Sequence, residues 1–178
     1  MPHIQLYTAL SIDGYIARED GSIDWLESLD NREQVDHGYS DFLAGVDTVV
    51  MGRTTYEQVV GFGVEWPYVG KQTYVVTRQG DYATATPETQ VANVVDDAWV
   101  RQLKRQSRSN IWLVGGGEVN AAFLQLGAID EMILSVIPVV LGAGRKLFAG
   151  DQPTSNFKLQ SAQPFSTGVV NLHYRRVD

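Results

Sequence analysis

The sequence contains no cysteine, which excludes disulfide bonds, thiolate nucleophiles and zinc sites built from thiolate ligands. Its three histidines are scattered without the spacing of metal ligands, so we expect no metal site. Acidic residues outnumber basic ones by 21 to 14, and the resulting net charge of −7 argues against a nucleic-acid partner. Any anion site must therefore be built locally, against the overall field.

Long hydrophobic runs are also missing. The longest mostly apolar stretch, residues 132–141, contains Ser135 and Pro138 and is too short to span a bilayer. The chain opens on a strand-like segment, without the basic and apolar regions of a signal peptide. We therefore expect a cytoplasmic protein with no membrane partner. The length of 178 residues, 44% of them hydrophobic, predicts a single domain over residues 1–178.

Strand-like and helix-like segments alternate along most of the chain. Strand patterns occupy residues 4–10, 46–51, 71–77, 91–95, 110–114 and 130–136. Helical patterns occupy residues 30–43, the segment after Arg53, a segment capped by Asp96 or Asp97, and the segment from Gly117 to Gly127. This alternation predicts an α/β fold with a mostly parallel central sheet and helices on both faces. Two final strands, 157–163 and 169–176, predict an antiparallel pair.

Two junctions between a strand and a helix have the composition of a phosphate site. They are Gly52–Thr55 and Gly115–Glu118, and the spacing of Thr54 and Glu57 predicts a capping box in the first. Glycine lets the backbone approach an anion, and the start of a helix offers unpaired N–H groups. In a parallel sheet both junctions lie on one edge, so a pyrophosphate fits between them.

Two arginines strengthen this interpretation. Arg53 stands at the start of a helix, where a cation is mildly unfavourable unless an anion is bound beside it. Arg78 follows the strand that ends at Thr77, on the same edge. Arginine pairs with phosphate oxygens through two parallel hydrogen bonds, so two of them favour a 2′-phosphorylated nicotinamide dinucleotide. A solvated arginine and simple close packing of the triple glycine are the alternatives.

These motifs resemble those of the dihydrofolate reductase-like superfamily. The stretches VVMGRTTYE and IWLVGGGEVNAAFL resemble its two cofactor-binding signatures, and ALSIDGYIA resembles its first strand and the loop beside the nicotinamide. The stretch IDEMILSVIPVVLGAGRKLF resembles the reductase domain of the riboflavin-biosynthesis deaminase–reductases, here in stand-alone form. The resemblance implies the three-layer fold of dihydrofolate reductase, NADPH as hydride donor and a homodimer.

The resemblance also implies positions for the cofactor. Arg53 and Arg78 would hold the 2′-phosphate, and Thr54 and Thr55 the other phosphates. The predicted cofactor-binding set is Ala9, Ile16, Gly52, Arg53, Thr54, Thr55, Thr77, Arg78, Val114, Gly115, Gly116, Gly117, Glu118 and Val119. In this set Ala9, Ile16 and Val114 would flank the nicotinamide.

The substrate is predicted less sharply. A small heterocycle is expected, with 5-amino-6-(5-phosphoribosylamino)uracil as the first candidate and dihydrofolate as the second. The helix carboxylate of dihydrofolate reductases matches a place near Gly38, with Asp36 and Asp41 out of register, and the arginine that contacts the substrate phosphate in riboflavin-pathway reductases is replaced by Leu43. Asp13 and Asp36 are the catalytic candidates, although Asp13 also suits a residue that fixes its loop. A nucleotide-binding protein without chemistry is the remaining alternative.

Overall fold

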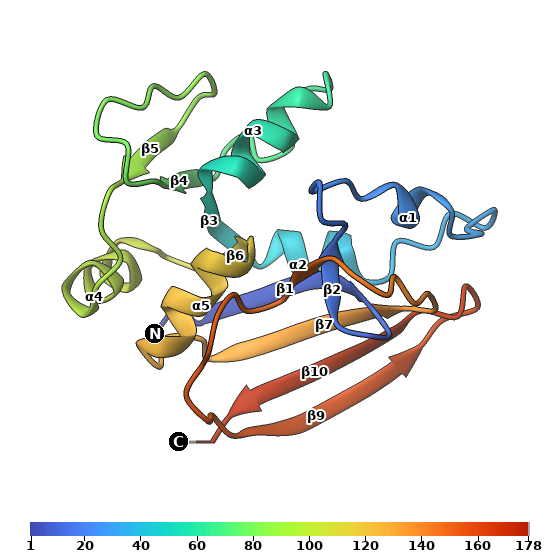
Figure 1. Cartoon of the computed structure of the whole chain (residues 1–178). Helices are drawn as coiled ribbons and strands as arrows, with labels where there is room; N and C mark the ends of the chain where they lie inside the picture. Colours follow the sequence, from blue (N-terminus) through green and yellow to red (C-terminus); the bar gives the residue numbers. More distant parts are fainter. Residues whose placement is uncertain (178) are drawn as a thin grey trace.

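The computed structural model describes residues 1–177, and an eight-stranded sheet runs through it (Figure 1). The strand order is β5-β4-β3-β6-β1-β7-β10-β9. The strands from β5 to β7 are parallel to their neighbours, whereas β10 is antiparallel to both β7 and β9. In chain order they are β1 (Ile4–Ser11), β3 (Val46–Gly52), β4 (Gln72–Val76), β5 (Thr89–Ala92), β6 (Asn110–Gly115), β7 (Glu131–Ile137), β9 (Phe157–Pro164) and β10 (Val170–Arg176).

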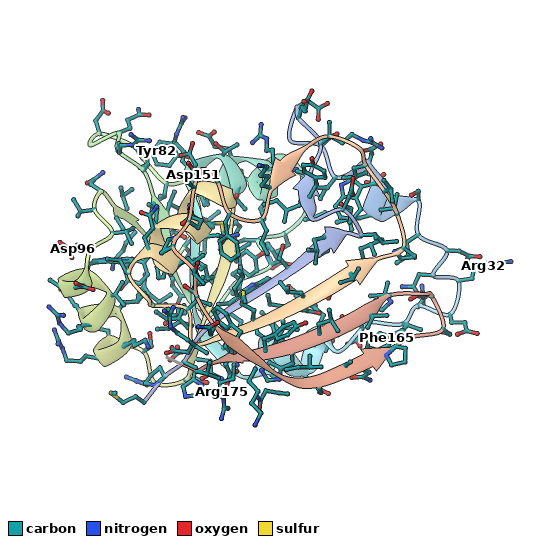
Figure 2. The ribbon with its side chains drawn as sticks, turned by 60° about the horizontal axis from the view of Figure 1, so that its bottom comes forward. Arg32, Tyr82, Asp96, Asp151, Phe165 and Arg175 are labelled. Atoms are coloured by element: carbon teal, nitrogen blue, oxygen red, sulfur yellow. The ribbon has the colours of Figure 1, made fainter. Side chains whose placement is uncertain are left out.

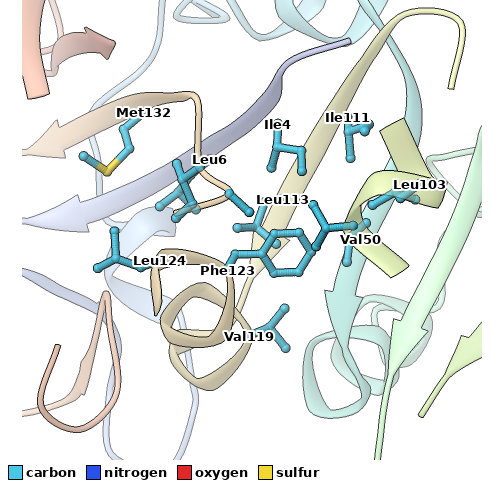
Figure 3. Close-up of a cluster of buried hydrophobic side chains, with 13 residues drawn as sticks. Ile4, Leu6, Val50, Leu103, Ile111, Leu113, Val119, Phe123, Leu124 and Met132 are labelled. Carbon is cyan, nitrogen blue, oxygen red and sulfur yellow. The ribbon is translucent and has the colours of Figure 1, made fainter. Parts of the chain in front are cut away.

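Helices cover both faces of the sheet, so the predicted α/β class and mostly parallel sheet are confirmed. Alternate residues of β1 and β6 point to opposite faces, as a strand requires. Leu6 and Leu113 lie in a buried cluster with α4 (Asp97–Gln106) and α5 (Gly117–Gln125), where Phe123 is fully buried (Figure 3). Tyr7 and Trp112 lie in a second buried cluster with α2 (Tyr39–Ala44) and α3 (Arg53–Gly61).

Two short elements complete the fold. Helix α1 (Asp24–Glu27) carries the buried Trp25, and a small ribbon pairs β2 (Tyr15–Ala17) with β8 (Arg145–Lys146). The ribbon joins the loop after β1 to the glycine-rich segment after β7. No helix in the part of the chain that the structure describes is long and apolar enough to cross a membrane.

The helix predicted over residues 30–43 is wrong in its first half, because only Tyr39–Ala44 is helical. The Asn31 side chain bonds both the N–H and the C=O of Val35, at 2.8 Å each, and so replaces helical hydrogen bonds with a loop. Gln34 and His37 have φ angles of 53° and 54°, outside the right-handed helical region. The helix therefore begins only after Gly38.

The capping box predicted at Thr54 and Glu57 is also wrong. Helix α3 begins two residues earlier than this box requires, at Arg53, with Gly52 at the cap position and no side-chain cap. Glu57 bonds the Arg53 side chain at 3.2 Å instead of reaching back to a backbone N–H group. The cap predicted at Asp96 or Asp97 is confirmed for Asp96, whose carboxylate accepts from the N–H of Trp99 at 2.8 Å.

Candidate functional site

The two glycine junctions lie side by side on one edge of the sheet. Strands β3 and β6 are parallel neighbours whose ends meet in register at Met51 and Gly115, and β4 flanks β3 on its other side. The turns into α3 and α5 and the segment Thr77–Arg78 therefore leave the sheet at adjacent carboxyl ends. We call residues 52–55, 77–78 and 115–119 the rim.

A direct contact joins the two junctions. The N–H of Gly116 donates to Oγ1 of Thr55 at 3.2 Å, so the start of α3 is tied to the turn before α5. The peptide between Gly115 and Gly116 is cis. The rim is thus one connected structure, built from two segments about 60 residues apart in the sequence.

The three glycines of the second junction have different surroundings. A Cβ on Gly117 would lie 2.6 Å from the carbonyl oxygen of Lys146, and one on Gly115 would lie 2.8 Å from the Asn120 side chain. Close packing against backbone therefore requires glycine at position 117, and at position 115 the φ of 106° favours glycine as well. A Cβ on Gly116 would meet only Thr55, at an ordinary 3.5 Å. Gly116 therefore borders open space on the rim, which is the position where a ligand can approach the backbone.

Both helices begin at the rim without a side-chain cap. In α5 the N–H of Asn120 makes the first bond back to the Gly116 carbonyl, at 2.9 Å. The N–H groups of Gly117, Glu118 and Val119 precede that bond and so belong to the unpaired start of the helix. Two uncapped helix starts on neighbouring strands form an arrangement that suits a diphosphate.

The two arginines reach the rim from different sides and make weak ion pairs. The Arg53 side chain is 44% exposed and bonds Glu57 at 3.2 Å, while the Arg78 side chain is 94% exposed and approaches Glu118 at 3.9 Å. Exposed pairs of this kind stabilise a protein by about 0–1 kcal/mol. Both guanidinium groups are therefore available to an anion that pairs with them better.

Other residues of the predicted cofactor set have mixed surroundings. Thr54 is exposed, whereas Thr77 is buried and its hydroxyl accepts from the N–H of Gln79 at 3.2 Å. The Val119 side chain packs in the core, so only its backbone faces the rim. Ile16 in β2 and Val114 in β6 are half-buried and do not belong to the rim.

A pocket of about 360 Å³ lies next to the rim, over β1 and β7. Its walls are mainly apolar and aromatic, and Ala9, which was predicted to flank the nicotinamide, is one of its lining residues. The lining residues are Tyr7, Thr8, Ala9, Leu26, Leu29, Asn31, Asp36, His37, Tyr39, Trp112, Ser135, Ile137 and Val169. Since β1 lies between β6 and β7, Ala9 stands between the second junction and the body of the pocket.

The two catalytic candidates are separated by the structure. Asp36 lines the pocket, and the backbone N–H of Gly38 and the Ser40 hydroxyl and N–H lower the pKa of its carboxyl, so it is ionised at neutral pH. Asp13 is not among the lining residues. Its carboxylate accepts from Leu141 and Gly142 at 3.1 and 2.7 Å, the contacts of a residue that fixes its loop.

Sequence reasoning missed most of the pocket. Burial raises the pKa of the phenols of Tyr7 and Tyr39, which keeps both protonated at neutral pH. His37, which was not among the predicted site residues, is half-buried and its Nε2 lies 2.8 Å from the Thr167 hydroxyl. One local pattern pointed to the pocket: side chains alternate between the two faces along β1, so Tyr7 lies on the same face as Ala9.

Within residues 1–177, no group of three histidine, cysteine, aspartate or glutamate side chains is arranged to hold a metal ion. The rim and the pocket are therefore the two candidate ligand sites among the described residues. The rim suits an anion, and the pocket suits a small planar molecule.

Comparison with known proteins agrees with this architecture. The family model described as the RibD C-terminal domain matches residues 2–171. The uncharacterized protein YwjB of Bacillus subtilis (strain 168) is 43% identical over 171 residues, which are 96% of each chain. A solved structure from Shewanella sp. PV-4, named for riboflavin biosynthesis, has a TM-score of 0.88 at 28% identity and covers 99% of both chains.

The structure of dihydrofolate reductase from Enterococcus faecalis, complexed with NADP(H), is more distant. It has a TM-score of 0.70 at 16% identity and covers 99% of this chain and 97% of that one. At this identity the likeness concerns the fold alone. The predicted dihydrofolate reductase-like fold, with its antiparallel C-terminal strand pair, is confirmed.

Proposed function

Because the chain belongs to the RibD C-terminal domain family, we propose that it is an NADPH-dependent reductase acting on a pyrimidine- or pteridine-related heterocycle. The family supports an oxidoreductase, and the dinucleotide of the Enterococcus enzyme supports a nicotinamide cofactor. The observation that carries the proposal is the rim beside the pocket, with Ala9 between them. A hydride donor and an acceptor bound in these two places would lie next to each other.

The rim has the groups that a phosphorylated dinucleotide needs. The N–H groups at the starts of α3 and α5 would hold the diphosphate, and the space at Gly116 admits it to the backbone. Arg53 and Arg78 would pair with the phosphate on the ribose, which favours NADPH over NADH. When bound, the dinucleotide supplies the hydride.

The pocket would orient the acceptor. Tyr7, Tyr39 and Trp112 form aromatic walls for a flat ring, and holding two reactants in place contributes roughly 7–11 kcal/mol toward a barrier. The protonated phenols and the Asp36 carboxylate provide a donor and an acceptor for its polar edge. The homodimer implied by the resemblance stays a prediction.

A second candidate, dihydrofolate reductase activity, is favoured by one observation: the carboxylate of Asp36 lines the pocket. Reduction of 5-amino-6-(5-phosphoribosylamino)uracil remains the candidate that the family resemblance suggests. Both reactions use the same cofactor and the same two sites, so they are separated by the substrate alone.

Two measurements test the proposal. Fluorescence titration should show tighter binding of NADPH than of NADH, because only NADPH carries the 2′-phosphate. Loss of NADPH absorbance should then occur with at least one member of a panel that contains dihydrofolate and the riboflavin precursor. Equal affinities would remove the assigned role of the arginines, and tight binding without turnover on any heterocycle would favour a nucleotide-binding protein without chemistry.

A further inference from the structure

Within residues 1–177, the walls of the pocket offer no permanent cation to a phosphate. Among the described residues that line it, none is lysine or arginine, and one, Asp36, is a carboxylate. A phosphomonoester that enters a largely apolar cavity loses hydration, and this is costly unless cations or several N–H donors replace the water. The composition of the lining therefore disfavours a dianionic group.

Three further polar side chains of the lining, those of Asn31, Ser135 and His37, already bond other groups within the protein. Asn31 bonds both backbone groups of Val35, and the Ser135 hydroxyl donates to Oδ1 of Asn171 at 2.7 Å. His37 holds Thr167 through Nε2. These groups fix the shape of the pocket, so a phosphate could recruit them only by breaking existing bonds.

Two basic residues, one next to Asn31 in the sequence and one bonded at the end of α2, do not serve the pocket. Arg32 extends from the molecule into solvent, with its side chain 89% exposed and paired with Asp30 at 2.6 Å (Figure 2). Lys71 donates through Nζ to the carbonyl oxygens of Leu43 and Val46, at 2.9 and 2.6 Å. Neither is part of this pocket's lining. Arg32 lines a separate hollow that shares Asn31 with the pocket and has Asp30 and Glu33 beside the arginine, and Lys71 already holds the backbone around the end of α2.

The rim and the pocket differ in the charge of the residues that line them. Within one acidic protein, two arginines and two uncapped helix starts gather at the rim, while the neighbouring pocket is lined by a carboxylate and by no lysine or arginine. The Asp36 carboxylate also repels a second anion, because like charges brought together disfavour binding.

We propose that the substrate of this reductase carries no phosphate: the pocket takes an uncharged or protonated planar nitrogen heterocycle, bound between its aromatic walls with an N–H group toward Asp36. The proposal rests on the proposed function, because it takes the pocket as the acceptor site. By this proposal the chain differs from a reductase that binds its substrate through a phosphoribosyl group.

The test uses a matched pair of ligands, 5-amino-6-(ribosylamino)uracil and its 5-phosphate. The full-length protein is saturated with NADP⁺, which fills the rim and permits no turnover, and binding is followed through the fluorescence of Trp112 and the other tryptophans. The compound without phosphate is expected to bind about tenfold more tightly. Equal or tighter binding of the 5-phosphate, or binding of neither compound, would overturn the proposal.

Two variants locate the source of the preference. Asp36→Asn removes the carboxylate charge from the pocket and is expected to narrow the preference by about two- to threefold. Asp41→Asn removes an equal charge from α2 at a residue outside the lining and should leave the preference unchanged. A preference that responds equally to both variants, or to neither, would show that Asp36 does not act on the ligand.

Failure of this proposal can be distinguished from failure of the proposed function. The ligand preference is measured with the oxidised cofactor and needs no reaction, whereas reductase activity is measured separately by NADPH consumption with each compound. Turnover of the 5-phosphate in preference to its partner would support the reductase and reject the phosphate-free substrate. If the compound without phosphate binds more tightly but neither compound is reduced, the phosphate-free ligand is supported and the reductase function is rejected.

Discussion

Two groups of charged residues lie at opposite ends of the sheet. In one the arginines and their carboxylate partners are exposed, and in the other an arginine pairs with a buried carboxylate. The rim holds Arg53 and Arg78 at the carboxyl ends of the parallel strands. The Glu131 cluster lies where β1 and β7 begin and comprises His3, Gln5, Glu131, His173 and Arg175. In Figure 2, Arg175 is at the lower margin, and Tyr82, whose ring centroid is 6.0 Å from the Arg53 guanidinium, is at the upper one.

The two groups differ in burial and in the number of hydrogen bonds. The side chain of Glu131 is 4% exposed and receives donors from Gln5, Arg175, His3 and His173 at 2.7–3.2 Å. At the rim, each arginine has one exposed carboxylate near it, at 3.2 and 3.9 Å. The hydrogen bonds of the buried Glu131 cluster join the strands β1, β7 and β10. The exposed rim, by contrast, leaves its hydrogen-bond donors accessible to a ligand.

The largest expected effect is on the Glu131 cluster. Glu131→Gln leaves four donors without their buried charge and should lower the free energy of unfolding by about 3 kcal/mol. Chemical denaturation measures this loss, with Glu65→Gln, an exposed site, as the control. NADPH affinity of the folded protein should not change, and a comparable loss of affinity would mean that the two ends of the sheet are not independent.

Acid should act on the same carboxylate. Burial by itself would raise the pKa of Glu131, but the four donors outweigh it and lower that pKa to about 2, below its value of about 4.5 in the unfolded chain. Its contribution is therefore fully present above about pH 4.5 and is lost as the pH falls toward 2. Glu131→Gln should flatten the stability curve in this interval, and an unchanged curve would contradict the assignment.

The next effect concerns the glycine that borders open space. Gly116→Val should weaken NADPH binding by about a hundredfold or more, equivalent to about 2.7 kcal/mol, because its side chain fills the space beside the backbone. Gly61→Val, at the other end of α3, is the matched control, because a Cβ added there meets no atom within 4 Å. Retained binding in Gly116→Val, with an unchanged melting temperature, would place the diphosphate elsewhere.

The smallest effect belongs to the arginines. Arg53→Ala should cost about 1–3 kcal/mol of NADPH binding, the range for a hydrogen bond to a charged group, and much less for NADH. Arg78→Ala should have a smaller effect, because this side chain is almost fully exposed and its charge is screened by water and salt. Isothermal titration with both cofactors measures the difference. Equal weakening of NADPH and NADH would assign Arg53 a structural role.

The rim could be predicted from the sequence because its signals are local. Each junction is a strand, a glycine and a helix within about ten residues, and parallel strands bring such junctions to the same edge. Whether the arginines hold a phosphate stays a prediction. The predicted helix over residues 30–43 failed because Asn31 forms a loop with Val35, a side-chain contact that an apolar periodicity does not reveal.

The pocket was largely missed for a different reason. Tyr7, Trp112, Ser135 and Val169 come from four separate segments, and they meet only through the strand order of the sheet. Single residues such as Tyr7 and Trp112 read as ordinary core aromatics in their strands. The lack of lysine and arginine among the lining residues is likewise a property of the assembled pocket, because no short stretch of the sequence shows it.

One feature of the pocket affects how the molecule is made. Asn171 in β10 bonds the carbonyl of His37 at 2.7 Å, and Val169 supplies part of the wall. During translation the rim segments have all been synthesised once α5 is complete at Gln125, whereas Val169 and Asn171, which help to build the pocket, come from the last part of the chain. Gly117 packs against Lys146 and its carbonyl accepts from the N–H of Ala149 at 3.0 Å, so the rim and the pocket are both completed by residues that are synthesised after α5.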